Sequence, residues 1–202
     1  MANSNKPFGL APVRTIGATT TGQTTRYYIY ATDTDPYYIG DAVISAAQGD
    51  AAGTPGVAKA TGALTLRGVV VGVEPANQLQ ASLSGATLNL ERTSIPATKS
   101  QAYYVYVDDN PATVFSIQGD ATATNQVATN SNKNFSLTVA NGATTSSDSG
   151  TVLSSSTINT NNTLNMKAMG LLQVPGNAYG AYAIWQCKIN LHELCAAGTT
   201  AI

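Results

Sequence analysis

Hydrophobic and polar residues alternate with a period of two in several short segments of this chain. In residues 26–31, for example, Tyr27 and Ile29 fall on one face and Tyr28 falls on the other. This alternation is typical of half-buried β-strands, and clusters of Gly, Pro, Asn and Asp separate the segments as turns would. Further segments of the same kind are residues 37–44, 64–73, 101–107, 113–118 and 135–139.

The strongest pattern lies near the end of the chain, in residues 183–192. One face of this predicted strand carries Trp185, Cys187, Ile189 and Leu191, and the other carries Gln186, Lys188, Asn190 and His192. Strands that recur at short spacing with turn residues between them indicate a sandwich or a barrel. Helical periodicity is weak and confined to residues 76–83, so we predict an all-β fold.

Two stretches of low complexity interrupt the strand pattern. Residues 46–61 are rich in Ala and Gly, and we predict a loop there. Residues 121–165 are rich in Ser, Thr and Asn, and we favour a polar β-hairpin or a long surface excursion over a disordered linker. Asn141-Gly142 is a strong hairpin-turn signal within that region.

The first fourteen residues have the character of an extended arm. Pro7 and Pro12 each remove a backbone donor and disfavour helix in the preceding residue. Apolar residues nevertheless recur along the arm, at Phe8, Leu10 and Val13. Such an arm either packs on its own domain or reaches a neighbouring subunit, and we favour the second. The predicted organisation is therefore an arm of residues 1–14 followed by a single domain of residues 15–202.

Composition narrows the classes of function. Charged residues are only 10% of the chain, against about 25% in typical soluble domains. The formal net charge of −1 argues against a partner that is a nucleic acid or a membrane surface. No secretory signal is recognisable at the start, and two cysteines do not form a disulfide framework, so we expect synthesis in a reducing cytoplasm.

Candidate chemistry is sparse. His192 is the single histidine, and on a regular strand it points away from Cys187, so we expect neither a metal site nor a Cys–His nucleophile. Asp108 and Asp109 are adjacent and precede Asn110-Pro111, which suggests a turn whose side chains accept backbone N–H bonds. No phosphate-binding loop or other cofactor motif is present. We predict that the chain is not an enzyme and needs no cofactor.

Ten tyrosines leave a second kind of function open. Tyrosine offers an apolar ring with a polar tip, which suits a sugar-binding surface as well as a protein core. Because the tyrosine clusters fall on both faces of their predicted strands, we favour core or interface positions over carbohydrate binding.

Five segments, in order along most of the chain, resemble the head-decoration or cement proteins of tailed bacteriophages. They are residues 6–14 (KPFGLAPVR), 40–43 (GDAV), 68–74 (GVVVGVE), 106–118 and 170–193. The resemblance implies a jelly-roll-like β-sandwich on the outside of a virion, bound to the major capsid protein of an HK97-type shell. It also implies self-association, as a homodimer or homotrimer, and no catalytic residues.

On this resemblance we expect the arm to supply the capsid or subunit interface. Its contact residues would be Pro7, Phe8, Leu10, Pro12, Val13 and Arg14, with Arg14 as a bidentate hydrogen-bond anchor. Tyr179, Tyr182 and His192 are further possible interface residues. The alternative function is a carbohydrate-binding or adhesive β-sandwich module on a virion surface.

Overall fold

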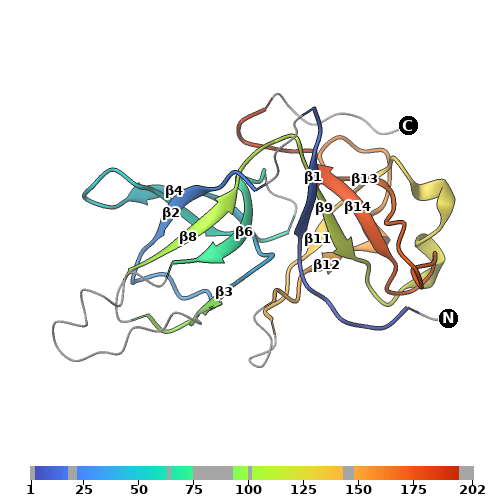
Figure 1. Cartoon of the computed structure of the whole chain (residues 1–202), viewed down its shortest axis with the longest axis horizontal. Helices are drawn as coiled ribbons and strands as arrows, with labels where there is room; N and C mark the ends of the chain where they lie inside the picture. The colour runs from blue at the N-terminus through green and yellow to red at the C-terminus, as the bar shows by residue number, and fades with distance from the viewer. Residues whose placement is uncertain are drawn as a thin grey trace.

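The computed structural model describes residues 3–17, 22–62, 65–74, 93–99, 102–142 and 148–195. Over these residues the fold is all-β, as predicted, with three single-turn 3₁₀ helices and no α-helix. Figure 1 shows a small barrel beside a second sheet, whose N-terminal edge strand lies on the side nearest the barrel. The weak helical pattern of residues 76–83 lies outside the described residues.

The barrel is built by the first half of the chain. Its strands are β2 (Thr25–Ile29), β4 (Ala42–Gly49), β5 (Pro55–Lys59), β6 (Gly68–Val73) and β8 (Tyr103–Asp108), in the closed order β2-β5-β4-β6-β8. Neighbouring strands are antiparallel except β2 and β5, which meet in parallel where Tyr28 faces Gly56. The residues that fill its interior are Tyr27, Ile29, Tyr37, Val43, Val57, Val70, Val73, Ile95, Tyr103, Val105 and Val107.

The loop predicted at residues 46–61 is wrong, because β4 and β5 form a hairpin there. Small residues permit the close pairing: a Cβ on Gly56 would lie 2.1 Å from the carbonyl oxygen of Gln48. The Asp50 carboxylate holds the turn by accepting the backbone N–H groups of Ala52 (2.9 Å) and Thr54 (2.7 Å). Low sequence complexity here reflects tight backbone packing rather than a loop.

The second half of the chain, together with the N-terminal strand β1, builds an antiparallel sheet in the order β1-β9-β14-β13-β10. Its strands are β1 (Ala11–Thr15), β9 (Thr113–Gln118), β14 (Ile184–Ile189), β13 (Met166–Leu171) and β10 (Asn134–Phe135). Two short pairs complete the fold: β3 (Tyr37–Tyr38) with β7 (Ser94–Ile95), and β11 (Leu137–Thr138) with β12 (Val152–Leu153). Strand β9 has the bounds that the alternation predicts, and the final strand ends three residues earlier than expected.

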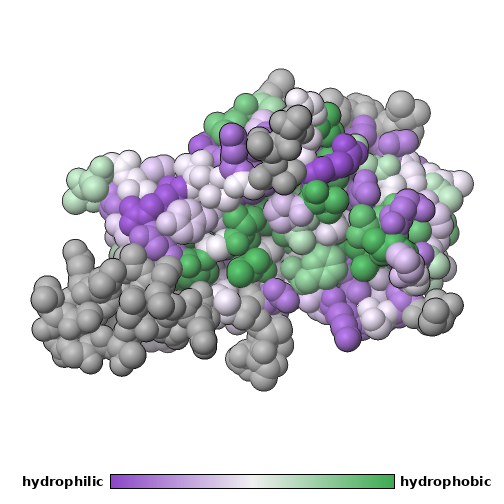
Figure 2. Space-filling view, in the orientation of Figure 1, coloured by the Kyte–Doolittle hydropathy of each residue, from purple (hydrophilic) through white to green (hydrophobic). Residues whose placement is uncertain are grey.

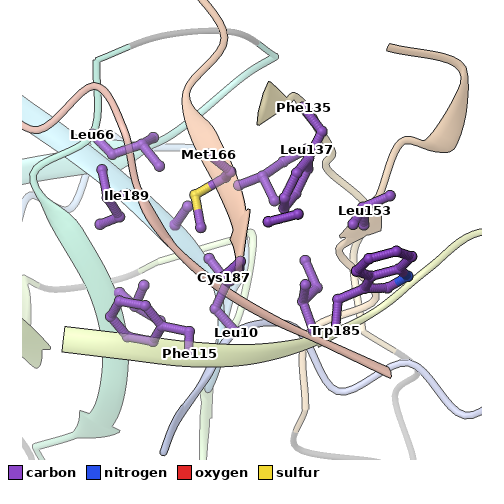
Figure 3. Packing of buried hydrophobic residues seen from close by; sticks show 14 of the residues in the cluster. Leu10, Leu66, Phe115, Phe135, Leu137, Leu153, Met166, Trp185, Cys187 and Ile189 are labelled. Atoms are coloured by element: carbon purple, nitrogen blue, oxygen red, sulfur yellow. The ribbon is translucent and has the colours of Figure 1, made fainter. Parts of the chain in front are cut away.

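One buried cluster joins the sheet to the barrel wall. Figure 3 shows Trp185 and Cys187 of β14 packed with Phe115 of β9 and Met166 of β13. The same cluster includes residues of the barrel wall and the segments next to it, namely Ala42, Ala60, Leu66 and Val69. The alternation predicted for the last strand is confirmed, since Trp185, Cys187 and Ile189 are all buried.

The finer prediction of one jelly-roll-like sandwich differs from the observed arrangement of a barrel and a sheet. Alternation shows which residues of a strand face inward, but it does not show which strands pair. Here β2 finds partners on both sides, in β5 and β8, so the first set of strands closes on itself instead of spreading into a layer.

The Ser/Thr/Asn-rich region, which we call the excursion, is only partly at the surface, because it also supplies Phe135, Leu137 and Leu153 to the buried core. Its described residues hold three 3₁₀ turns, η1 (Ala123–Asn125), η2 (Ala128–Asn130) and η3 (Ser155–Thr157), together with β10, β11 and β12. Asn141-Gly142 is not a two-residue hairpin turn, because β11 ends at residue 138 and β12 begins at residue 152. Asn159 exchanges two backbone hydrogen bonds with Asn134, of 2.9 and 3.0 Å, which ties the excursion to the outer side of β10.

Candidate functional site

The segment before β1 lies on the body of its own chain. The Asn3 side chain donates a hydrogen bond to the carbonyl oxygen of Ala178 (2.8 Å). Gln118 clamps the same segment from β9: its Oε1 accepts the Lys6 N–H (3.0 Å), and its Nε2 donates to the Ser4 carbonyl oxygen (2.8 Å). The structure therefore places the N-terminal residues along the sheet, not in a free arm.

Leu10 is a core residue and not a docking contact, which corrects the prediction for that position. Its side chain is 1% exposed, and its N–H donates to the carbonyl oxygen of Gly40 (2.9 Å). The approach is close enough that a Cβ on Gly9, which has φ +70°, would lie 2.5 Å from that same oxygen. Two glycines in contact thus allow the segment to pass the barrel and enter β1.

Residues 11–15 also belong to the domain, since β1 pairs with β9 and forms one edge of the sheet. The boundary predicted after residue 14 therefore falls within a strand. The register slips between Pro12 and Arg14, which leaves Val13 as a β-bulge with 40% of its side chain exposed. Pro7, Pro12 and Arg14 are exposed and Phe8 is half-buried, so five of the six predicted arm residues remain at the surface.

An apolar groove of about 270 Å³ runs beside this segment, where the sheet meets the barrel. Its lining is mainly apolar and includes Phe8, Leu10, Pro12, Ile39 and Val71, together with the acids Asp108 and Asp148. Figure 2 shows hydrophobic residues gathered in the middle of this face, over the junction. We call the exposed residues Pro7, Phe8, Pro12, Val13 and Arg14, together with this groove, the β1 surface.

Two of the other predicted interface residues lie near the start of the same segment. Tyr179 is 42% exposed and packs edge-on against the buried Trp185, with ring centroids 5.6 Å apart. Tyr182 is half-buried and, with Asn3 and Phe8, lines a second hollow of about 390 Å³. The structure thus brings residues from both ends of the chain together at one end of the sheet.

His192 is buried away from these residues, which corrects its prediction as an interface residue. Its backbone forms an isolated parallel β-bridge with Leu66, next to the barrel, and the residue is 3% exposed. Nδ1 accepts the N–H of Leu194 (3.1 Å), and Nε2 has no hydrogen-bond partner among the described residues. Burial, followed by the charge of Arg67, lowers the pKa of His192 below its ordinary 6.5.

The adjacent acids lie at the end of β8, just before a turn, and only Asp108 accepts a local backbone N–H as predicted. Asp108 Oδ1 accepts the hydroxyl of Thr113 (3.0 Å) and the N–H of Asn110 (3.2 Å), and burial raises the pKa of Asp108. Asp109 accepts the Tyr27 hydroxyl (2.7 Å); burial first, and then this hydrogen bond, raise the pKa of Tyr27 to about 12. Within the described residues, no three His, Cys, Asp or Glu side chains gather into a possible metal site.

Two features escaped the sequence analysis. The tilted rings of Tyr28 and Tyr104 contact each other on the outside of the barrel with centroids 5.7 Å apart, and the Arg26 guanidinium lies 3.5 Å from the centroid of the Tyr104 ring. The alternation along β2 placed Tyr28 on the face opposite Tyr27, but it did not show that pairing with β8 brings Tyr104 beside Tyr28. The second feature is a buried ion pair between Lys59 and Asp41, which no local sequence pattern connects.

No helix in the described part of the chain is long and apolar enough to cross a membrane. No protein-family model, curated protein or solved structure matches this chain. Two observations therefore bear on function: the β1 surface, and the resemblance of five sequence segments to phage head-decoration proteins.

Proposed function

We propose that this chain is a structural decoration protein of a phage head. It would bind the outer surface of an HK97-type shell and stabilise contacts between major capsid protein subunits. The β1 surface carries the proposal, because it presents mainly apolar side chains, with Arg14 on the strand and Asp108 and Asp148 at the groove, on a segment that is already held in place. An ordered surface loses little conformational freedom when a partner binds.

The distribution of charge supports apolar docking. Several of the few charged side chains are paired within the chain: Arg26 with Glu74, Lys59 with Asp41, Arg67 with Asp109, and Lys99 with Asp33. Interface cores in stable complexes are depleted of charge, since an unpaired buried charge is costly. Binding through the β1 surface would then depend chiefly on apolar contact, with Arg14 as the local cation.

The experiment compares two exposed valines. Val13→Asp places a carboxylate on the β1 surface, whereas Val127→Asp places one on the excursion, outside the β1 surface, at a residue that is 37% exposed. Binding is measured by co-sedimentation with undecorated heads of the same virus, and protection by the temperature at which those heads open. We expect Val13→Asp to weaken binding at least tenfold and Val127→Asp to leave it unchanged.

Substitution is a cleaner test than removal of residues 1–14, because that deletion would also remove Leu10 and most of β1. Failure of the unaltered protein to bind heads would refute the proposed function. Unchanged binding by Val13→Asp would refute the role of the β1 surface.

A second candidate function is favoured by the tyrosines on the barrel. Tyr28, Tyr30 and Tyr104 present rings at the surface next to Arg26, an arrangement that suits stacking against a sugar ring. Saturable binding on a glycan array, abolished by Tyr28→Ala in a protein with no affinity for heads, would support an adhesive module instead.

A further inference from the structure

Three polar side chains meet where the barrel touches the excursion. Lys59 ends β5, Asp41 precedes β4, and Asn141 follows β11. The Lys59 Nζ lies 2.9 Å from Asp41 Oδ2 and 3.0 Å from Asn141 Oδ1. A carbonyl bond is about 1.23 Å long, so the amide carbon of Asn141 is no more than one bond beyond the atom that Nζ already contacts.

The lysine is held away from water. Its side chain is 5% exposed, and the Asp41 side chain is fully buried. Nζ also donates to the Pro36 carbonyl oxygen (3.0 Å) and lies 5.5 Å from the centre of the Tyr38 ring. A shielded amine fixed beside an amide carbonyl has the arrangement that proximity catalysis needs.

Asp41 is placed to accept a proton from this lysine. Burial raises the pKa of Asp41, against the opposing effects of Lys59, the Ser149 hydroxyl and the Tyr38 N–H, which all donate to the carboxylate. A carboxylate whose charge is penalised by burial takes up a proton from a neighbour more readily than one in water.

We propose that Lys59 and Asn141 form an intramolecular isopeptide bond, with Asp41 as the proton relay. Asp41 takes a proton from the Lys59 ammonium, and the free amine adds to the amide carbon Cγ of Asn141. The Nζ–Cγ bond forms, the Cγ–Nδ2 bond breaks, and the two protons lost by Nζ leave with the amide nitrogen as ammonium. The step is a transamidation and needs no oxidant or reductant.

The surroundings of Asn141 suit the departure of ammonia, because this residue is exposed while its two partners are buried. The bond would join positions 82 residues apart and fasten the barrel to the excursion beyond β11. This inference does not depend on the proposed function, and its test requires no capsid.

A competing reaction shares the same electrophile. Gly142 follows Asn141, and its backbone nitrogen can attack Cγ to give a succinimide with loss of the same ammonia. Loss of about 17 Da from the intact protein is therefore expected for both reactions and does not separate them. The two products differ in whether Lys59 is consumed.

The experiment is denaturing mass spectrometry of the full chain, followed by trypsin digestion. Trypsin cuts after Lys and Arg, so an unlinked protein yields a peptide that ends at Lys59 and another spanning residues 134–167. The isopeptide bond blocks cleavage at Lys59 and predicts one branched species that joins residues 27–67 to residues 134–167. Fragmentation of that species locates the bond.

Lys59→Arg is the matched control, since it keeps a cation beside Asp41 but supplies no amine. We expect Lys59→Arg to yield no branched species and Asp41→Asn to lower the linked fraction at least tenfold. An unmodified mass for the unaltered protein, or a loss of about 17 Da without the branched species after digestion, would overturn the proposal.

Discussion

Among the described residues, several buried polar atoms lack a hydrogen-bond partner, and the one on His192 belongs to a titratable group, which gives it a consequence for pH. One of its ring nitrogens accepts a backbone N–H, and the other is buried without a partner. The folded state therefore favours the neutral ring. The charged groups around it are Arg67 and Lys188, which oppose protonation, and Asp109 and Glu193, which favour it less strongly than burial opposes it.

We predict that acid weakens the fold through this residue. Because the pKa of His192 is lower in the folded state than the ordinary 6.5, the unfolded chain binds more protons below that pH, and stability falls as pH decreases from about 6.5. The loss is at most about 1.4 kcal/mol per pH unit. Urea unfolding at pH 7.5, 6.5 and 5.5 measures it, and His192→Gln should reduce the slope. An equal slope in both proteins would contradict the prediction.

At the scale of single elements, β1 is both a structural strand and the proposed contact surface. Leu10, just before the strand, packs in the core, and the bulge at Val13 exposes an apolar side chain on the proposed contact surface. Substitutions at these two positions separate the two roles, since only one of the side chains lies in the core.

We expect Leu10→Ala to destabilise the protein by about 2–5 kcal/mol, because it leaves a cavity in the cluster around Phe115 and Trp185. Val13→Ala should change the free energy of unfolding by less than about 0.5 kcal/mol, as is usual at exposed positions. Denaturant unfolding followed by circular dichroism compares the two. A small effect of Leu10→Ala would mean that the N-terminal segment does not belong to the folded unit.

Sequence patterns predicted individual strands well and their partners poorly. The alternation of residue types located β9 and identified the buried face of β14. In the structure β14 alternates between buried and half-buried residues, whereas β9 is buried along its whole length. It did not show that the Ala/Gly-rich segment pairs as β4 and β5, since the evidence there is backbone proximity rather than side-chain pattern. Leu10 was assigned to the interface for a related reason. A short segment with spaced apolar residues has the same sequence pattern whether it packs on its own domain or on a partner.

No local sequence pattern predicts the site at which Lys59, Asp41 and Asn141 meet. Asp41, Lys59 and Asn141 are far apart in the sequence, and no spacing rule connects them. Only the closure of the barrel and the path of the excursion bring their side chains within hydrogen-bonding distance.

For the whole molecule, the shared core between barrel and sheet predicts a single cooperative unit. The only tryptophan, Trp185, is buried in the sheet, whereas eight of the ten tyrosines precede residue 107, in or beside the barrel strands. Because Leu66 and Val69 near the barrel belong to the same buried cluster as Trp185, neither part buries its apolar surface alone.

We therefore expect the two parts to unfold together. Tryptophan fluorescence follows the sheet, and near-ultraviolet circular dichroism of the tyrosines follows mainly the barrel. Their denaturation midpoints should coincide within experimental error, and Leu66→Ala should shift both by the same amount. Two separate midpoints would show that the barrel and the sheet are independent domains.

The edges of the strands decide how this protein behaves when many copies are crowded together. The barrel is closed, and one edge of the sheet is occupied where Asn159 bonds to Asn134 on β10. At the other edge, Pro12 lacks an N–H group and the bulge at Val13 breaks the register, so an incoming strand finds no regular ladder to extend. Growth of fibrils by strand addition is thereby discouraged, and a concentrated stock of this β-rich, weakly charged protein should remain dispersed.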